Sequence, residues 1–267
     1  MKSGKVFLVG AGPGDPELLT LKALRLIRSA EVIVYDRLVG EEILEFVSPD
    51  KEMIFVGKTS GRHTLPQESI NQVLIEKAQE GKQVVRLKGG DPFIFGRGGE
   101  EALACKNAGI PFEIIPGITA ANAVAAYAGI PLTHRGISQC LTLITGHIQQ
   151  GEQLPDLNWS QFTSPNQTLV FYMALSTLPQ IVERLTGHGL SPQTPIAVIE
   201  NGTLDRQRTV VATLDLISHE VERAHVQSPC LIVVGQVVAL REELQWFEQL
   251  SEADMVSVAS GMSTLAL

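Results

Sequence analysis

Short apolar runs alternate with segments of helical period along almost the whole chain. Each run is four to six residues long and ends in glycine, proline or a charged residue, which is typical of buried strands in an α/β protein. We expect strands at Val6–Val9, Val32–Tyr35, Met53–Val56, Val84–Leu87, Phe112–Ile115, Leu141–Ile144, Thr168–Met173, Ile196–Ile199 and Leu231–Val234.

The helices between these runs have recognisable ends. Asp15 with Pro16 is a plausible helix start, and Pro66 to Glu80 has inward-facing apolar positions and Gly81 as its stop. We also expect helices at 100–108, from about 119 to 128, near 178–185 and near 214–221, and a long loop at 149–166.

A turn-rich, aperiodic stretch at 129–136 interrupts the alternation, which then restarts. The pattern therefore predicts an α/β fold of two α/β lobes with a cleft between them. We expect an N-terminal lobe at 1–135, a C-terminal lobe at 136–250 that also makes dimer contacts, and a frayed tail at 251–267.

The stretch from Val85 to Glu101 carries more local signals than a packing loop needs. It holds two glycine clusters, the corner Gly89-Gly90-Asp91-Pro92, and cations at Arg86, Lys88 and Arg97. Paired glycines let a backbone approach a ligand closely. We interpret the stretch as a binding edge at the end of a strand.

Charged residues also end two other expected strands, with Asp36 and Arg37 after one and Lys58 after the next. The carboxyl ends of strands in an α/β sheet border the ligand cleft. Any one of these residues alone would be an ordinary strand-end charge. Together with Arg86 to Asp91 on a third strand, they indicate a shared cleft.

Composition narrows the possible partners. The net charge of −8 disfavours nonspecific nucleic-acid binding. Residues 1–135 carry 16 Lys and Arg against 16 Asp and Glu, whereas residues 136–267 carry 5 against 13. The cations therefore accompany the glycine motifs. The asymmetry is explained either by chance with an acidic, solvated C-terminal half, or by contact of the first half with an anionic ligand.

The remaining signals concern location and cysteines. No apolar run is long enough to span a bilayer, and the N-terminus lacks secretory features, so a cytoplasmic protein without a membrane partner is expected. Cys105, Cys140 and Cys230 are widely spaced, which predicts neither disulfides nor a cysteine zinc site. We expect them to be small buried hydrophobic residues.

Several common chemistries lack their motifs. Gly10-Ala11-Gly12-Pro13-Gly14-Asp15 follows a strand, but Asp15 occupies the third-glycine position of the dinucleotide fingerprint. No phosphate loop, H-E-x-x-H metal motif or G-x-S-x-G nucleophile motif occurs, and no metal is expected. A nicotinamide oxidoreductase and a noncatalytic binding protein remain as alternatives.

Taken in order, several motifs resemble the tetrapyrrole methylase family. They run over nearly the whole chain to about Phe247 and comprise residues 9–21, 34–38, 56–58, 85–101, 116–120, 129–135, 145–147, 170–173, 200–203 and 228–234. Some family members are fused to a dehydrogenase-ferrochelatase module. Because the motifs begin at residue 9, we expect this chain to lack that module.

The resemblance implies a homodimeric methyltransferase that binds S-adenosyl-L-methionine between its lobes and releases S-adenosyl-L-homocysteine. It implies methylation of uroporphyrinogen III at C2 and then C7 to give precorrin-2, for sirohaem and cobalamin synthesis; the alternative is a related methylase acting on a later precorrin. It implies Asp36 as proton acceptor and Lys58 as donor. The implied cofactor contacts are Pro13, Gly89, Gly90, Asp91, Ile94, Thr119, Ala120, Met173, Gly202 and, further, Cys230.

Methyl transfer to an electron-rich pyrrole carbon needs positioning rather than a side-chain nucleophile, so the missing motifs fit this chemistry. The substrate carries eight carboxylates, which arginine binds well. We expect its anchors among Arg37, Lys58, Arg62, Arg86, Arg97 and Arg135.

Overall fold

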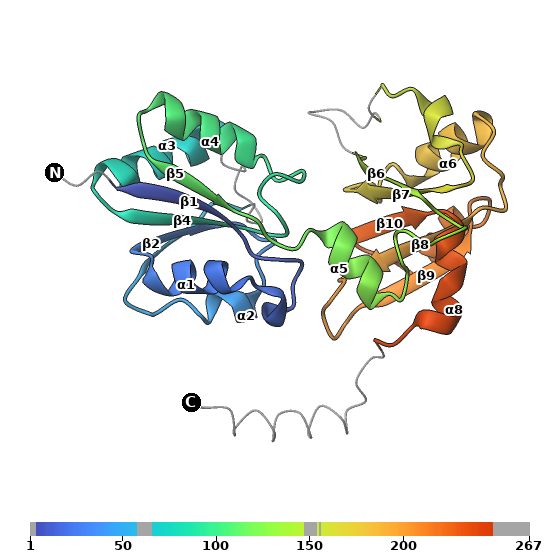
Figure 1. Cartoon of the computed structure of the whole chain (residues 1–267), viewed down its shortest axis with the longest axis horizontal. Helices are drawn as coiled ribbons and strands as arrows, with labels where there is room; N and C mark the ends of the chain where they lie inside the picture. Colours follow the sequence, from blue (N-terminus) through green and yellow to red (C-terminus); the bar gives the residue numbers. More distant parts are fainter. Residues whose placement is uncertain (1–3, 58–65, 147–153, 155, 248–267) are drawn as a thin grey trace, which may run out of the picture. The chain divides into compact units, whose positions relative to one another are not determined.

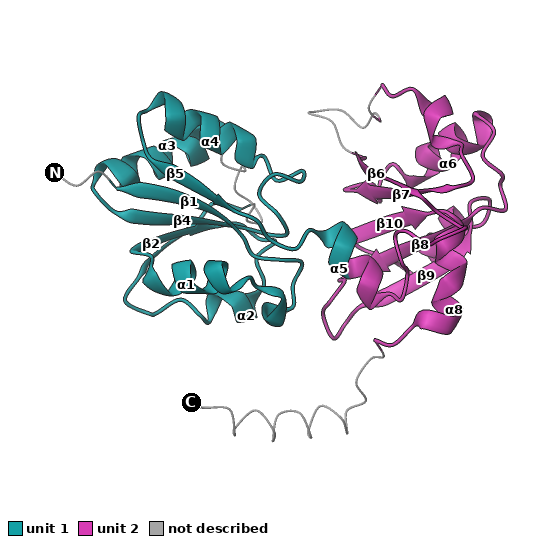
Figure 2. Ribbon diagram, viewed as in Figure 1, with its two compact units in different colours: residues 1–123 teal, residues 124–267 magenta. Residues whose placement is uncertain are grey.

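The computed structural model describes residues 4–57, 66–146, 154 and 156–247 of the 267-residue chain. The chain divides into two compact units, residues 1–123 and residues 124–267 (Figure 2). We call them unit 1 and unit 2 and describe each by itself. Their division falls inside helix α5 (Ala120–Tyr127), whereas the sequence pattern places it near residue 135.

Unit 1 is built on a five-stranded sheet in which every pairing is parallel. Its order is β3-β2-β4-β1-β5. All-parallel sheets are covered on both faces, which is why the strands are near-continuous apolar runs. The strands are β1 (Lys5–Gly10), β2 (Val32–Tyr35), β3 (Glu52–Phe55), β4 (Gln83–Lys88) and β5 (Phe112–Ile115).

Helices cover both faces of this sheet (Figure 1). On one face, α1 (Leu21–Ser29) and α2 (Glu41–Leu44) bury Ile27 and Ile43 against the strands. On the other face, α3 (Gln67–Gln79) and α4 (Gly98–Asn107) pack in a second apolar cluster. A short 3-10 helix, η1 (Pro16–Leu18), precedes α1, whose start is capped by the Thr20 hydroxyl accepting from the Ala23 amide at 3.1 Å.

Unit 2 contains a mixed sheet of order β6-β7-β10-β8-β9, in which only the β6–β7 pairing is parallel. Its buried core centres on Phe171, Ile181 and Ile232. The strands are β6 (Cys140–Thr145), β7 (Gln167–Tyr172), β8 (Pro195–Glu200), β9 (Arg208–Thr213) and β10 (Cys230–Val234). The helices after α5 are η2 (Trp159–Phe162), α6 (Leu178–Gly187), α7 (Ile217–Arg223), η3 (Gln236–Leu240) and α8 (Arg241–Leu244).

The sequence pattern predicts the α/β class and nine of the ten strands that lie in the described ranges. It misses β9, an edge strand whose residues are mostly half-buried and therefore lack an apolar run. The expected loop at 149–166 contains η2, where Trp159 and Phe162 are buried. No described helix is long and apolar enough to span a membrane.

Candidate functional site

The predicted site residues of unit 1 follow the carboxyl ends of its parallel strands, so they lie at one edge of one sheet. Pro13 follows β1, Asp36 follows β2, and Thr119 follows β5. Gly89, Gly90 and Asp91 follow β4, the central strand. Lys58, which follows β3, and Arg62 lie outside the described residues.

The two glycine loops at this edge are joined by main-chain hydrogen bonds. The Gly90 amide donates to the Gly12 carbonyl at 2.6 Å, and the Gly12 amide donates back at 3.1 Å. Both glycines have positive φ, 76° for Gly12 and 69° for Gly90, a region that side chains disfavour.

Two further glycines allow the β1 and β5 loops to touch. A Cβ on Gly10 would lie 2.5 Å from the Gly117 Cα, and a Cβ on Gly117 would lie 2.3 Å from the Gly90 carbonyl oxygen. The sequence suggested that paired glycines here admit a ligand. In the structure, Gly10, Gly90 and Gly117 admit one another's backbones and thereby fix the edge.

The Asp91 carboxylate holds the loop that follows β4. One oxygen accepts from the amides of Phe93 at 2.8 Å and Ile94 at 3.1 Å, and the other accepts from the amide of Gly117 at 3.1 Å. These bonds link the β4 loop to the β5 loop. Asp91 therefore orders the backbone of the predicted cofactor loop, whatever else it contacts.

The same loop exposes an aromatic and cationic surface. Phe93, Ile94 and Phe95 are among the exposed large hydrophobic residues. Phe95 and Arg97 have φ of 52° and 59°, an uncommon conformation for such residues that marks candidate functional backbone. Arg97, half exposed, donates to both oxygens of Glu100 at 2.8 and 2.7 Å.

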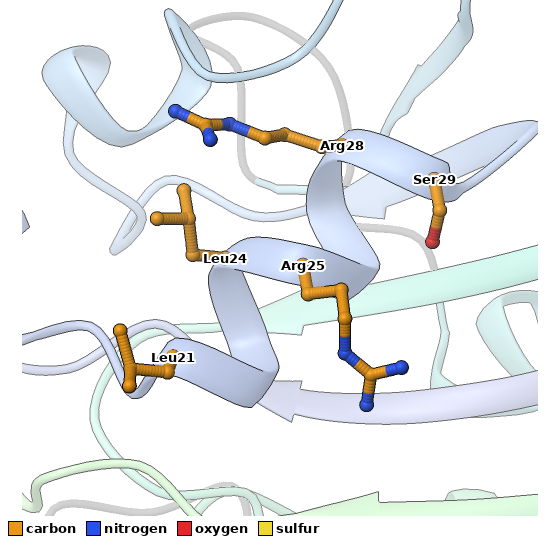
Figure 3. A pocket seen from close by; sticks show the side chains of 5 residues that line it. All are labelled: Leu21, Leu24, Arg25, Arg28 and Ser29. Carbon is orange, nitrogen blue, oxygen red and sulfur yellow. The ribbon is translucent and has the colours of Figure 1, made fainter. Parts of the chain in front are cut away.

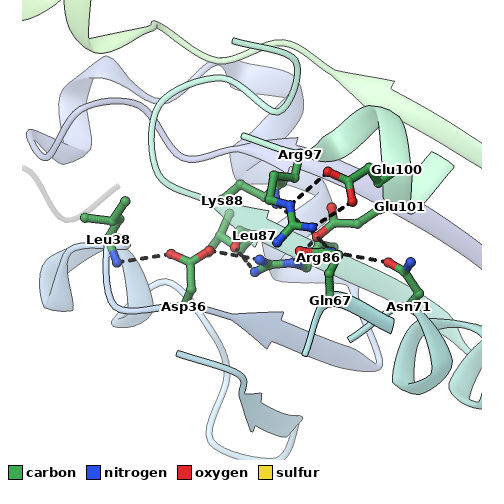
Figure 4. A network of polar contacts seen from close by, with 10 residues as sticks. All are labelled: Asp36, Leu38, Gln67, Asn71, Arg86, Leu87, Lys88, Arg97, Glu100 and Glu101. Carbon is green, nitrogen blue, oxygen red and sulfur yellow. Dashed lines mark hydrogen bonds and ion pairs between the residues drawn. The ribbon is translucent and has the colours of Figure 1, made fainter. Parts of the chain in front are cut away.

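Beneath the edge lies a buried charged cluster that we call the β4–α4 cluster: Arg86, Lys88, Glu101 and Gln67 (Figure 4). One Glu101 oxygen accepts from Arg86 at 3.1 Å, Lys88 at 3.0 Å and Gln67 at 3.2 Å. Arg86 also donates to the Asp36 carboxylate at 2.9 Å and to the Leu87 carbonyl at 2.9 Å.

This arrangement corrects the prediction that Arg86 anchors the substrate. Its side chain is 3% exposed, and its guanidinium already serves Asp36, Glu101 and a carbonyl. A bulky anion has no direct access to a side chain so deeply buried. Burial also lowers the pKa of Lys88, and repulsion from Arg86 adds to that shift.

Asp36 differs from its buried neighbours because part of its side chain reaches solvent. It is 24% exposed, one oxygen accepts from the Leu38 amide at 3.1 Å, and the other accepts from Arg86. The carboxylate is thus held in orientation at both oxygens while remaining accessible.

Two of the predicted substrate anchors, Arg37 and Arg135, are exposed. Arg37 follows Asp36 in unit 1, and Arg135 lies in unit 2.

In unit 2, the predicted cofactor residues gather at one end of the mixed sheet. Met173 follows β7, Gly202 follows β8, and Cys230 begins β10 opposite Glu200 of β8. Met173 is 53% exposed with φ of 52°, and Asn201 and Thr203 also have positive φ. Strained non-glycine backbone of this kind concentrates at ligand sites.

The cysteines divide into different environments. Burial, with Glu200 nearby, raises the pKa of Cys230 to about 12, so the thiol is neutral near pH 7. Cys105 is buried, and burial raises its pKa to about 11. Cys140 is exposed at the start of β6, which corrects the expectation that all three are buried.

Other features of the described residues do not compete with this site. A hollow of about 370 Å³ lies on the outer side of α1, lined by Leu21, Leu24, Arg25, Arg28 and Ser29, none of them a predicted site residue (Figure 3). Within the described ranges, no group of three or more His, Cys, Asp or Glu side chains could hold a metal ion.

Sequence reasoning missed Glu101, Lys88 and Gln67 as supports of the site. A signal was present, because Arg86 and Lys88 alternate with apolar residues in a strand buried on both faces. Two cations at buried positions require an anionic partner. The sequence alone does not say which acidic residue supplies it.

These features define a class: an α/β protein whose candidate ligand site lies at the carboxyl edge of a parallel sheet, with glycine loops and an oriented carboxylate. The family model for tetrapyrrole (corrin/porphyrin) methylases matches residues 5–217. The chain belongs to this family, as its motifs predict.

Curated relatives and solved structures agree. The chain is 55% identical over 244 residues to a sirohaem synthase of Methylobacillus flagellatus and 54% identical over 251 residues to one of Azotobacter vinelandii. The alignments cover 91% and 94% of this chain but 52% and 54% of those proteins, so the chain spans about half their length.

Two solved structures align with this chain over almost their whole length. Uroporphyrin-III C-methyltransferase of Thermus thermophilus, solved with S-adenosylhomocysteine, is 40% identical, with a TM-score of 0.76, over 88% of this chain and 99% of that one. The cobalt precorrin-4 methyltransferase CbiF is 26% identical, with a TM-score of 0.78, over 88% of this chain and 95% of that one.

Proposed function

We propose that the chain is an S-adenosylmethionine-dependent C-methyltransferase that methylates uroporphyrinogen III at C2 and then C7, giving precorrin-2 by way of precorrin-1. The observation that carries this proposal is the edge of unit 1, where glycine loops, an oriented Asp36 and exposed cations meet. The similarity to the Thermus enzyme supports both cofactor and acceptor.

The residues present fit a nucleoside cofactor. Gly89, Gly90, Asp91 and Ile94 follow β4, and Thr119 and Ala120 follow β5, which flanks the other side of β1. These residues are half-buried or exposed, and their backbone offers amides and carbonyls. In unit 2, Met173, Gly202 and Cys230 lie at one end of the sheet and offer sulfur and main-chain contacts. With Pro13, these residues would hold S-adenosylmethionine. When bound, it supplies an electrophilic methyl group on a sulfonium.

The chain's own contribution is to position the acceptor and receive its proton. A pyrrole carbon that gains a methyl group must lose a proton, and a carboxylate at the site both accepts it and stabilises positive charge on the ring. Asp36 is oriented by Leu38 and Arg86 and is open to solvent. We assign it as the proton acceptor and Lys58 as the donor.

Exposed arginines are the proposed anchors for the substrate's carboxylates: Arg37, Arg97 and Arg135, with Arg62. Arg97 already presents its guanidinium edge to the Glu100 carboxylate. A solvent-exposed ion pair contributes about 1 kcal/mol or less, so a substrate carboxylate can replace Glu100 at little cost. Phe93 and Phe95 add exposed aromatic surface on the same loop.

A later precorrin is the second candidate acceptor, because CbiF shares the fold with a TM-score of 0.78. The higher identity to the uroporphyrin-III enzyme, 40% against 26%, favours uroporphyrinogen III. We further propose that the chain acts as a cytoplasmic homodimer and that its product supplies sirohaem and cobalamin synthesis.

To test the proposal, the purified chain is incubated with uroporphyrinogen III and methyl-labelled S-adenosylmethionine. The mass of the product is then measured by mass spectrometry. We expect two added methyl groups. If methyl groups are transferred to a later precorrin and not to uroporphyrinogen III, the later precorrin is the acceptor.

Arg97→Ala should raise the KM for the substrate with little effect on cofactor affinity. An unchanged KM would remove Arg97 from the proposed anchors. Light scattering of the purified wild-type chain checks the dimer.

A further inference from the structure

The β4–α4 cluster has no part in the proposed chemistry, but its Arg86 hydrogen-bonds to Asp36, the proposed proton acceptor. Arg86, Lys88 and Glu101 are 3%, 4% and 0% exposed, and they bring two cations and an anion into the interior of unit 1. Burying charges is costly unless they are paired, and apolar residues of similar size would fill the space at no such cost. The fold alone therefore gives little reason for them.

The geometry gives a reason. Arg86 reaches from the middle of the cluster to the Asp36 carboxylate, 2.9 Å away, and Glu101 holds the other side of the guanidinium at 3.1 Å. Strands β2 and β4 are neighbours, and Val34 pairs with Arg86 in their register, two residues before Asp36. The guanidinium is fixed at three points, by Glu101, Asp36 and the Leu87 carbonyl.

We propose that Arg86 is a positioning residue that sets the orientation of the Asp36 carboxylate for proton acceptance, and that Glu101 fixes Arg86 in place. Lys88 donates to the same Glu101 oxygen as Arg86, and the two cations are balanced by the two carboxylates, Glu101 and Asp36. The inference rests on the proposed function, because it gives Asp36 the catalytic role.

The charges facing Asp36 support this reading. The Arg86 guanidinium contacts Asp36 directly, and Lys88 and Glu101 lie behind it on β4 and α4. Arg37 is adjacent in sequence and exposed. Of these groups, Arg86 is the one that hydrogen-bonds to the Asp36 carboxylate and is also buried, so it orients Asp36 without competing for substrate.

The experiment is a double-mutant cycle on kcat. Arg86→Gln should lower kcat by about 10- to 100-fold, the size expected for losing a hydrogen bond to a charged group, while the KM for both ligands changes less than about threefold. In the Asp36→Asn background, Arg86→Gln should lower kcat by less than about twofold further. Arg86→Lys should restore part of the loss.

Additive effects would overturn the proposal, because a residue that acts only through Asp36 has nothing left to do once Asp36 is neutral. A wild-type kcat in Arg86→Gln would overturn it as well. Glu113→Gln is the matched control: Glu113 also binds two cations, Lys5 and Lys22, on β5 of the same unit, and this variant should keep kcat within about twofold.

Two further measurements separate folding and function from positioning. If Arg86→Gln does not fold, Arg86→Met with Lys88→Met and Glu101→Met removes all three charges of the cluster. We expect a folded protein with low kcat, and wild-type kcat would overturn the proposal. If the wild-type chain methylates no tetrapyrrole, the proposed function fails. The crystal structure of Arg86→Gln then decides positioning: a displaced Asp36 carboxylate supports it, and an unmoved one overturns it.

Discussion

Unit 1 supports its candidate site residues with buried charges and touching glycine backbones, whereas unit 2 supports its own with strained turns on an apolar core. Among the residues of unit 1 that the structure describes, the buried polar ones are Gln67, Arg86, Lys88 and Glu101. Those of unit 2 within the described ranges are neutral hydroxyl and amide side chains plus Glu200, whose partner Arg208 is 47% exposed. Buried charge lies beneath the carboxylate that we propose as proton acceptor, whereas the described cofactor residues of unit 2 rest on a core with little buried charge.

The largest expected effect breaks the embedded charge. Glu101→Ala leaves Arg86 and Lys88 buried without their anion, and we expect a loss of about 3–5 kcal/mol in the free energy of unfolding. Glu200→Ala in unit 2 should cost about 1 kcal/mol, because Arg208 can turn toward solvent. Urea denaturation of both variants measures the difference. Equal losses would erase the distinction between the units.

A second effect tests the glycine contacts of unit 1. Gly117→Ala places a Cβ 2.3 Å from the Gly90 carbonyl oxygen, which belongs to backbone rather than to a side chain that could turn aside. We expect a loss of about 1–3 kcal/mol. Gly99→Ala in α4 meets nothing within 4 Å and should be neutral or slightly stabilising. Chemical denaturation of both variants measures the change in unfolding free energy. No loss in Gly117→Ala would mean that the loops can move apart to accommodate the added methyl group.

A third effect compares how the two units hold their ligand loops. Asp91→Ala releases three backbone amides, and we expect affinity for S-adenosylhomocysteine to fall by about 10- to 100-fold in calorimetry. Asn201→Gly in unit 2 relieves a φ of 49° and should leave folding as stable or more stable. Retained affinity in Asp91→Ala would place the cofactor away from this loop.

The smallest effect concerns a surface pair of unit 1 and depends on pH. The hydrogen bond from Lys22, and then that from Lys5, lowers the pKa of Glu113 from 4.5 to about 2. A lowered carboxylate pKa stabilises the folded state above pH 4.5, and this contribution is lost as pH falls toward 2. Because the pair is about one-third exposed, Glu113→Gln should cost less than about 1 kcal/mol at pH 7.

The difference in unfolding free energy between wild type and Glu113→Gln should therefore shrink between pH 4.5 and pH 2. Parallel urea titrations at pH 7, 4 and 2.5 provide the comparison. A difference that grows toward low pH would contradict the assigned ion pairs.

The sequence predicts the elements of unit 1 well because each of its strands contains a short apolar run, and site residues follow soon after those runs. Asp36 and Asp91 could be placed at one sheet edge for that reason. The partner of Arg86 could not be assigned, since it depends on how α4 packs against β4. The sequence pattern does not predict β9, because an edge strand of half-buried residues has no continuous apolar run.

The hydrogen-bonded contact of Gly12 with Gly90, together with the close packing of Gly10 against Gly117, has a consequence for redesign. Loop lengths and main-chain paths at this edge are locked to each other, so an inserted or deleted residue in any one loop disturbs all three. A change of acceptor is better sought in side chains that these loops merely carry, such as Phe93, Phe95 and Arg97. The backbone of these loops should therefore be kept, and the exposed side chains should be varied.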